Sequence, residues 1–300
     1  MKKILSFIIL AGMAVSFNAC RKNDNPKLPD IEKGVLPQLV QDPKRDLLIK
    51  EVADFSTAFN TDLYFKNGAQ PKKMDLMVTM NGDYSNPKLL KADITTFPTK
   101  QEVTGTQLTG LFGIQPTTVK PGDYFEIRPS ITLQSGAFLP AFRQAMINGE
   151  LTNLEPYGVD AANFPDASMT LTYEKVCPYL RADFLSASNV LYVDDNKFTG
   201  ASYPVNVDIS SDGNTWTFTN WAGVPGAKVV MTLDQQTYKV TIAKQIYAVT
   251  ADELDPSEHN WTIVGSGKIN PCSLSISLTV TNTSKESNYG SVPIKIYVKR

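Results

Sequence analysis

The sequence has few of the residues that most often carry chemistry. Its 300 residues include one histidine, His259, and three cysteines. Zinc sites draw mainly on cysteine and histidine, and an activated nucleophile needs a nearby base, most often an imidazole. His259 lies in the polar, turn-like segment 255–260, which is typical of a solvated loop. The composition therefore argues against a zinc site and against a nucleophilic triad.

An excess of charge of one sign is also missing. Lysine and arginine number 29, aspartate and glutamate 30, and the formal net charge is −1. Nucleic-acid-binding proteins show a basic patch or stripe, and electrostatic binding to a membrane surface needs a basic cluster. We therefore expect no nucleic-acid partner and no electrostatic attachment to a membrane.

Carboxylates are present but poorly arranged for catalysis. Asp194 and Asp195 are adjacent, and neighbouring residues of a strand point to opposite faces, so they are not expected to form the carboxylate pair of a glycosidase. The oxygen-rich turns 194–196 and 211–214 do not fit the twelve-residue calcium loop. The sequence predicts a protein without catalytic activity, metal or cofactor.

Long apolar runs are absent except at the N-terminus. Lys2 and Lys3 precede an apolar run over residues 4–15. This length suits the h-region of a signal peptide, roughly 7–15 residues, and falls short of the about 20 that cross a bilayer. Ala19-Cys20 then resembles the lipobox of bacterial lipoproteins, in which the signal is cleaved before a cysteine that becomes lipidated. The alternative is an ordinary secretory signal.

These features divide the chain into four parts. Residues 1–19 are the predicted lipoprotein signal, and residues 20–44, rich in proline, lysine, asparagine and aspartate, are a lipid-anchored tether. Cys177 and Cys272 remain as an even pair in an exported chain, which predicts a disulfide; two buried free thiols are the alternative. We place the boundary between two domains, 45–176 and 177–300, at Cys177-Pro178.

Alternation of apolar and polar residues predicts an all-β protein. In the first domain Met74, Leu76, Val78 and Met80 share one face, and short strands separated by glycine and proline turns indicate an Ig-like antiparallel sandwich. Residues 47–55 are also expected to form a strand, 106–113 a helix of one or two turns, and 142–147 a short helix within a less regular stretch.

The second domain is predicted to be an eight-stranded up-and-down β-meander, either a barrel or a compact sandwich. The expected strands cover residues 182–194, 203–209, 215–221, 227–233, 238–242, 261–269, 273–281 and 292–298.

Aromatic residues are the better candidates for a binding site, because flat rings offer apolar faces to sugar C–H groups. The candidates are Tyr192, Tyr203, Trp216, Trp221 and Trp261. Regular alternation would place Trp216 on one face of its strand and Trp221 on the other, so one is expected in the core and one at the surface. The alternative is that all five pack in the core, where large aromatics usually lie.

The chain resembles a family of accessory lipoproteins of the Bacteroidetes. The resemblance rests on the lipobox, the proline-rich tether, the strand that begins Pro121-Gly122-Asp123-Tyr124-Phe125, and a Cys-Pro-led meander containing Tyr203-Pro204 and Asn220-Trp221. It implies a two-domain β lipoprotein of the outer membrane, often encoded beside glycan-uptake systems of the starch-utilisation type.

The resemblance favours display at the cell surface over the periplasmic face. It predicts a non-catalytic binding protein that is accessory to the capture and uptake of oligo- or polysaccharides. Outer-membrane glycan-uptake proteins are further possible partners. The alternative is a structural or adhesive, fimbria-like surface lipoprotein, which would have a donated or vacant edge strand.

Overall fold

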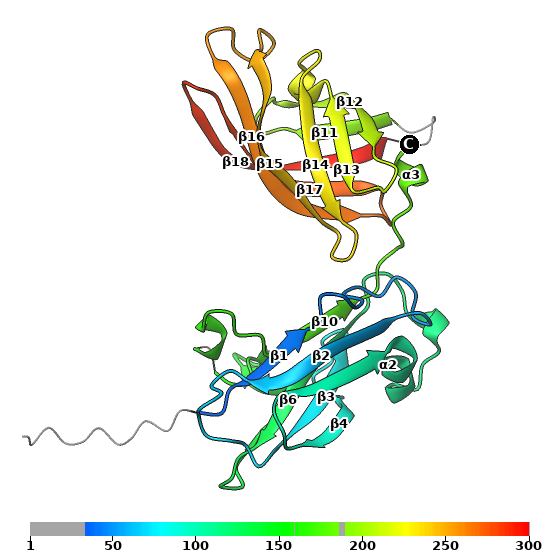
Figure 1. The fold of residues 1–300 in the computed structure, drawn as a ribbon, viewed down its shortest axis with the longest axis vertical. Helices are drawn as coiled ribbons and strands as arrows, with labels where there is room; N and C mark the ends of the chain where they lie inside the picture. The colour runs from blue at the N-terminus through cyan, green and yellow to red at the C-terminus, as the bar shows by residue number, and fades with distance from the viewer. Residues whose placement is uncertain (1–33, 159, 186–189, 300) are drawn as a thin grey trace, which may run out of the picture.

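The computed structural model describes residues 34–299 apart from 159 and 186–189. The predicted signal peptide, Cys20 and most of the tether lie outside the described residues. The fold is all-β, as predicted, with 51% of the described residues in strands and 8% in helices. Two hydrophobic cores lie on either side of Cys177, and a single connection joins the two halves (Figure 1).

The first half is built from antiparallel sheets packed in a sandwich-like way around one of these cores. A three-stranded sheet has the order β1 (Pro37–Gln41), β2 (Ser56–Leu63), β5 (Thr99–Thr104). A five-stranded sheet has the order β10 (Leu171–Glu174), β6 (Tyr124–Thr132), β3 (Lys73–Met80), β4 (Lys88–Ile94), and β7 (Phe138–Leu139) also pairs with β6. Short 3₁₀ helices, η1 (Pro116–Thr118) and η2 (Ala161–Asn163), lie in the connections.

The local predictions for this half hold where alternation is clear. Met74, Leu76 and Val78 of β3 are fully buried. The predicted helix is α2 (Gly105–Leu111), and it begins where the Thr104 hydroxyl accepts a hydrogen bond from the Gln107 N–H. Such a cap satisfies one of the free N–H groups of the first turn.

Two local predictions are wrong. Residues 47–55 form turns, with one isolated bridge between Ile49 and Lys175. The buried side chains in this segment are Ile49, Val52 and Phe55, every third residue. A strand cannot place every third side chain on one face, because its side chains alternate between faces. Residues 142–147 contain β8 (Arg143–Ile147), which pairs with β9 (Glu150–Leu154) and forms no helix. The turn between them is Asn148-Gly149, both with positive φ, a strong hairpin signal.

The second half is a closed barrel in which each strand pairs with the next and the last pairs with the first. Its strands are β11 (Val190–Asp195), β12 (Ala201–Ile209), β13 (Thr215–Thr219), β14 (Lys228–Asp234), β15 (Lys239–Thr250), β16 (His259–Asn270), β17 (Ser275–Thr283) and β18 (Asn288–Lys299). This confirms the up-and-down order, and it decides for a barrel. The expected strand 182–194 is wrong in its first part, where α3 (Arg181–Leu185) packs Phe184 against Trp216, with ring centroids 5.0 Å apart.

Two glycines let β16 follow the curvature of the barrel. A Cβ on Gly265 would lie 2.7 Å from the Thr279 carbonyl oxygen, and one on Gly267 would lie 1.9 Å from that of Ser277. Both oxygens belong to the backbone of β17, so neither position has room for a side chain. A glycine in a strand interior often marks such a close approach.

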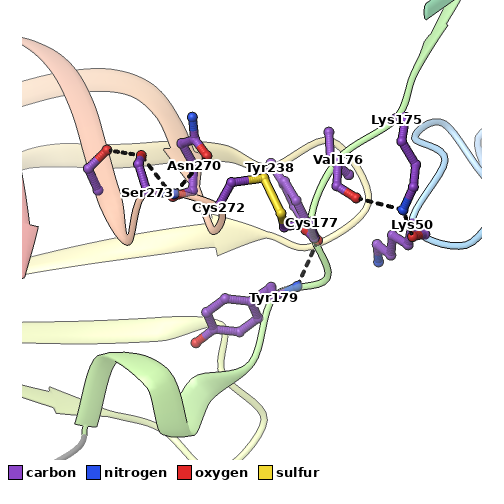
Figure 2. Close-up of a disulfide and its surroundings, with 10 residues drawn as sticks. Lys50, Lys175, Val176, Cys177, Tyr179, Tyr238, Asn270, Cys272 and Ser273 are labelled. Atoms are coloured by element: carbon purple, nitrogen blue, oxygen red, sulfur yellow. Dashed lines mark hydrogen bonds between the residues drawn. A yellow bond between two sulfur atoms is a disulfide. The ribbon is translucent and has the colours of Figure 1, made fainter. Parts of the chain in front are cut away.

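A disulfide between Cys177 and Cys272 ties the connection between the halves to the β16–β17 turn (Figure 2). The Tyr238 hydroxyl donates to the Cys177 carbonyl and accepts from the Tyr179 N–H, at 2.9 and 2.8 Å. On the other side, the Lys175 ammonium donates to the carbonyls of Lys50 and Val176. The connection is therefore held covalently to the barrel and by hydrogen bonds to both halves.

Candidate functional site

Four of the five aromatic candidates lie in the barrel core. Trp216, Trp221 and Trp261 are at most 2% exposed, and Tyr203 is also buried. These four rings offer no free face to a sugar in solution, so the alternative of core packing describes them better than the predicted binding role.

The expectation that Trp216 and Trp221 point to opposite faces is wrong for an identifiable reason. The strand β13 ends at Thr219, two residues before Trp221. Asn220 and Ala222 then have φ of 65° and 57°, the left-handed region, and the short 3₁₀ helix η3 (Trp221–Gly223) begins. This turn directs Trp221 back into the core, where its ring centroid lies 5.8 Å from that of Phe218.

Tyr192, the fifth candidate, lies on the outer face of the barrel. Its neighbours on β11, Leu191 and Val193, are buried, and Tyr192 is only partly so. It is paired across the ladder with Tyr297 of β18, and their rings stack with centroids 6.2 Å apart and planes 27° from parallel. The Lys299 ammonium lies 4.7 Å from the Tyr192 ring centroid, within the range of a cation–π contact.

Tyr297 was not among the binding residues predicted from the sequence. Its signal was present, because alternation over 292–298 places Ile294, Ile296 and Val298 on one face and therefore Tyr297 on the other. The three aliphatic residues are buried and Tyr297 is half-buried. What the sequence did not contain was the closure of the barrel, which brings β18 beside β11.

A row of polar side chains crosses the outer face two residues further along these strands. Successive residues of the row are direct partners across the ladders: Asp194 with Lys295, Lys295 with Ser277, Ser277 with Lys268, and Lys268 with Lys239. Neighbouring strands are about 4.8 Å apart. The row therefore presents carboxylate, hydroxyl and ammonium groups along the outer face at a regular spacing.

Three hollows of the surface adjoin one another at Ser277. One, of about 510 Å³, is lined by Asp194, Ser277 and Lys295 among others; a second, of about 700 Å³, includes Lys239 and Lys268. A third, of about 420 Å³, lies at the junction with the first half, where Leu48, Lys175 and Tyr238 also line it. Together with Tyr192 and Tyr297 they form an elongated region that we call the outer-face site.

Asp195 differs sharply from its neighbour Asp194, as the alternation predicts. It is 2% exposed inside the barrel and accepts a hydrogen bond from the Phe198 N–H. Burial raises the pKa of this carboxyl above its ordinary value. Burial also raises the pKa of the Tyr203 and Tyr247 hydroxyls, and the Tyr247 hydroxyl has no hydrogen-bond partner among the described residues. This interior group has no access to the outer-face site.

The single histidine lies at a strand end beside an acidic residue. His259 begins β16 and does not lie in a loop as expected; its Nδ1 is 3.3 Å from a carboxylate oxygen of Glu286. Within that part, no three histidine, cysteine or acidic side chains gather in a way that could hold a metal ion. None of its helices has the length and apolar character needed to cross a membrane.

The outer-face site presents side chains that are suited to binding a ligand. Tyrosine faces can pack against apolar groups, and serine, lysine and aspartate can exchange hydrogen bonds with a polyhydroxylated ligand. The sequence matches no protein-family model, and no curated protein matches it either.

Proposed function

We propose that this protein is a lipid-anchored cell-envelope protein that binds oligo- or polysaccharides and assists their capture and uptake without catalysis. The single observation that supports this best is the stacked pair Tyr192–Tyr297 beside the elongated hollows of the outer-face site. Anchoring through Cys20 and display at the outer membrane rest on the lipobox and on the resemblance to accessory lipoproteins.

The arrangement suits a chain-like ligand better than a small compact one. The hollows adjoin one another at Ser277 and cross β15 to β18, and Tyr192 and Tyr297 lie on the same outer face. A sugar stacked on the tyrosine pair would have its neighbours in the chain over the row from Asp194 to Lys239. Apolar contact with the rings supplies affinity, and hydrogen bonds along the row supply orientation.

The test uses the soluble chain from residue 21 onward. A screen against plant, host and microbial glycans, followed by calorimetry, should give a saturable ligand. Tyr192→Ala and Tyr297→Ala should each weaken it about tenfold, which corresponds to about 1.4 kcal/mol. Phe138→Ala removes an exposed ring of the first half and is the matched control, with unchanged affinity expected.

The proposal fails if no glycan binds, or if a bound glycan is insensitive to both tyrosine substitutions. A structural or adhesive role is the second candidate. The observation that favours it is a partly unpaired strand edge in the barrel, between β14 and β15.

A further inference from the structure

The barrel ladder is incomplete between β14 and β15. The two strands pair at only three positions, from Thr232 opposite Thr241 to Asp234 opposite Lys239. On its other side, β14 pairs from Lys228 to Thr232 with the full length of β13. Residues 228–231 therefore have no strand partner on the β15 side among the described residues.

Irregularities in β15 account for the separation. Its ladder with β16 shifts register between Ile242 and Gln245 and again between Ile246 and Ala248. Each extra residue of this kind bends a strand and increases its local twist. Beyond Ile242, β15 follows β16 in a long hairpin and no longer runs beside β14 (Figure 1).

The free edge of β14 presents backbone groups at alternate residues. The Leu233 N–H donates to the Asn214 carbonyl at the start of β13, so Leu233 faces β13. Alternate residues of an antiparallel strand direct their N–H and C=O to opposite neighbours, and hence Lys228 and Val230 direct theirs toward the β15 side. The ladder of β15 does not reach either residue.

The side chain of Gln245 occupies the place of a strand at Val230. Its Oε1 accepts from the Val230 N–H at 2.8 Å, and its Nε2 donates to the Val230 carbonyl at 2.7 Å. These are the two hydrogen bonds that one residue exchanges with its partner in a hydrogen-bonded antiparallel pair. The edge is therefore able to form strand hydrogen bonds, and a single amide group forms them here.

Exposed aliphatic side chains lie on β14 itself and on the β15–β16 hairpin. Val230 and Val264 are each 39% exposed, Ile246 57% and Val249 66%. Ile246 is opposite Thr262 on β16, two residues from Val264, so these two are diagonal neighbours on one face. Pockets for alternate side chains give specificity when an extended peptide adds to a sheet edge.

We propose that the edge of β14 at Lys228–Met231 binds an extended, acidic and aliphatic segment of a partner protein by strand addition. Lys228 and Lys244 flank the edge, are exposed, and form none of the ion pairs found among the described residues. Carboxylates of the segment pair with these two lysines, and its aliphatic residues cover Val230 and Ile246. A second copy of this chain would bring lysines against lysines at the same edge. The proposal concerns a surface that the glycan proposal does not use.

Gln245 competes with such a segment, which gives the proposal a distinctive consequence. The segment must displace the amide from Val230. The apparent dissociation constant is therefore the intrinsic constant divided by the fraction of chains in which the edge is open. Removing the amide should therefore tighten binding. A residue that only closes the barrel would have no such effect.

The experiment measures fluorescence anisotropy with a fluorescein-labelled peptide, acetyl-Glu-Val-Thr-Val-Asp-Val-Thr-amide, and the chain from residue 21 onward. Gln245→Ala should bind it at least threefold more tightly than the unchanged chain. Gln236→Ala, in the turn between β14 and β15, is the matched control and should bind as the unchanged chain does. The double variant Lys228→Glu, Lys244→Glu should bind at least tenfold more weakly.

A peptide with lysine in place of its glutamate and aspartate should show no saturable binding to the unchanged chain, and this comparison needs no variant that could fail to fold. The proposal is overturned if the two peptides bind alike, if neither the unchanged chain nor Gln245→Ala binds the acidic peptide, or if Gln245→Ala does not bind it more tightly. Light scattering that shows Gln245→Ala dimerising without peptide would assign the edge to a second copy and overturn the partner assignment.

Discussion

Replacing Cys177 with serine removes the cross-link between the connecting segment and the β16–β17 turn. The disulfide closes a chain separation of 95 residues, from just before α3 to the turn after β16. The residues in that loop belong almost wholly to the barrel. The cross-link therefore restricts the unfolded barrel, and it places no restriction on the unfolded first half.

The size of the effect follows from the loop length. Chain-entropy reasoning gives about 4.7 kcal/mol for a loop of this length, and native disulfides typically contribute about 2–5 kcal/mol. A loss of about 3 kcal/mol lowers the Tm of a domain of this size by about 10 °C. The two hydrophobic cores share no buried residue, so two unfolding transitions are expected.

Differential scanning calorimetry of the chain from residue 21 onward measures both transitions. Cys177→Ser should lower the barrel transition by about 10 °C and leave the sandwich transition within about 2 °C. Cys272→Ser should reproduce this shift, and a reducing agent should add nothing to either variant. Equal shifts of both transitions, or no shift of the barrel transition, would refute the reasoning that the constraint acts on the unfolded barrel.

Three further predictions concern the barrel. Trp216→Ala should lower the barrel's free energy of unfolding, measured by urea unfolding, by about 3–5 kcal/mol, because removal of a fully buried ring leaves a cavity. A loss under 1 kcal/mol would contradict the core position of Trp216. Gly267→Ala should cost about 1–3 kcal/mol or more in the same assay, since the added Cβ would collide with the Ser277 carbonyl, and an unchanged stability would show that β16 is less closely packed. Asp195→Asn should stabilise the barrel at pH 7. Folding raises the pKa of this buried carboxyl, so its ionisation destabilises the fold progressively as the pH rises from the ordinary pKa of 3.8 through the raised one. The gain in the free energy of unfolding should therefore shrink toward pH 3.

Much of the fold was predictable because it rests on local alternation. The β3 pattern at Met74, Leu76 and Val78 and the eight-strand meander depend on a period of two, which each segment carries by itself. The failures occur where the period is not two. Residues 47–55 bury every third side chain without forming a strand. The helix predicted at residues 142–147 is wrong for another reason, because the Asn148-Gly149 turn pairs this segment with the next strand.

The candidate site was predictable only in part. Tyr192 was identified as an aromatic residue of a strand, but nothing in a single strand tells which residue of another strand lies beside it. Tyr297 became its partner because the last strand of the barrel closes on the first, a contact between residues about a hundred positions apart in the chain. The pairing of Asp194 with Lys295 at the end of the polar row depends on the same closure.

The sequence by itself determined the all-β class, the up-and-down order of the second half, and the face on which each residue of a regular strand lies, because these follow from local periodicity and turn residues. Tertiary structure decided where strands end and what lies beside them. Trp221 is buried because β13 stops at Thr219 and the chain turns back, and Tyr192 stacks on Tyr297 because β18 lies next to β11. Gln245 replaces a strand at Val230 because β15 bends away from β14. Each outcome depends on which distant strand a residue meets, and alternation within one segment carries no information on that.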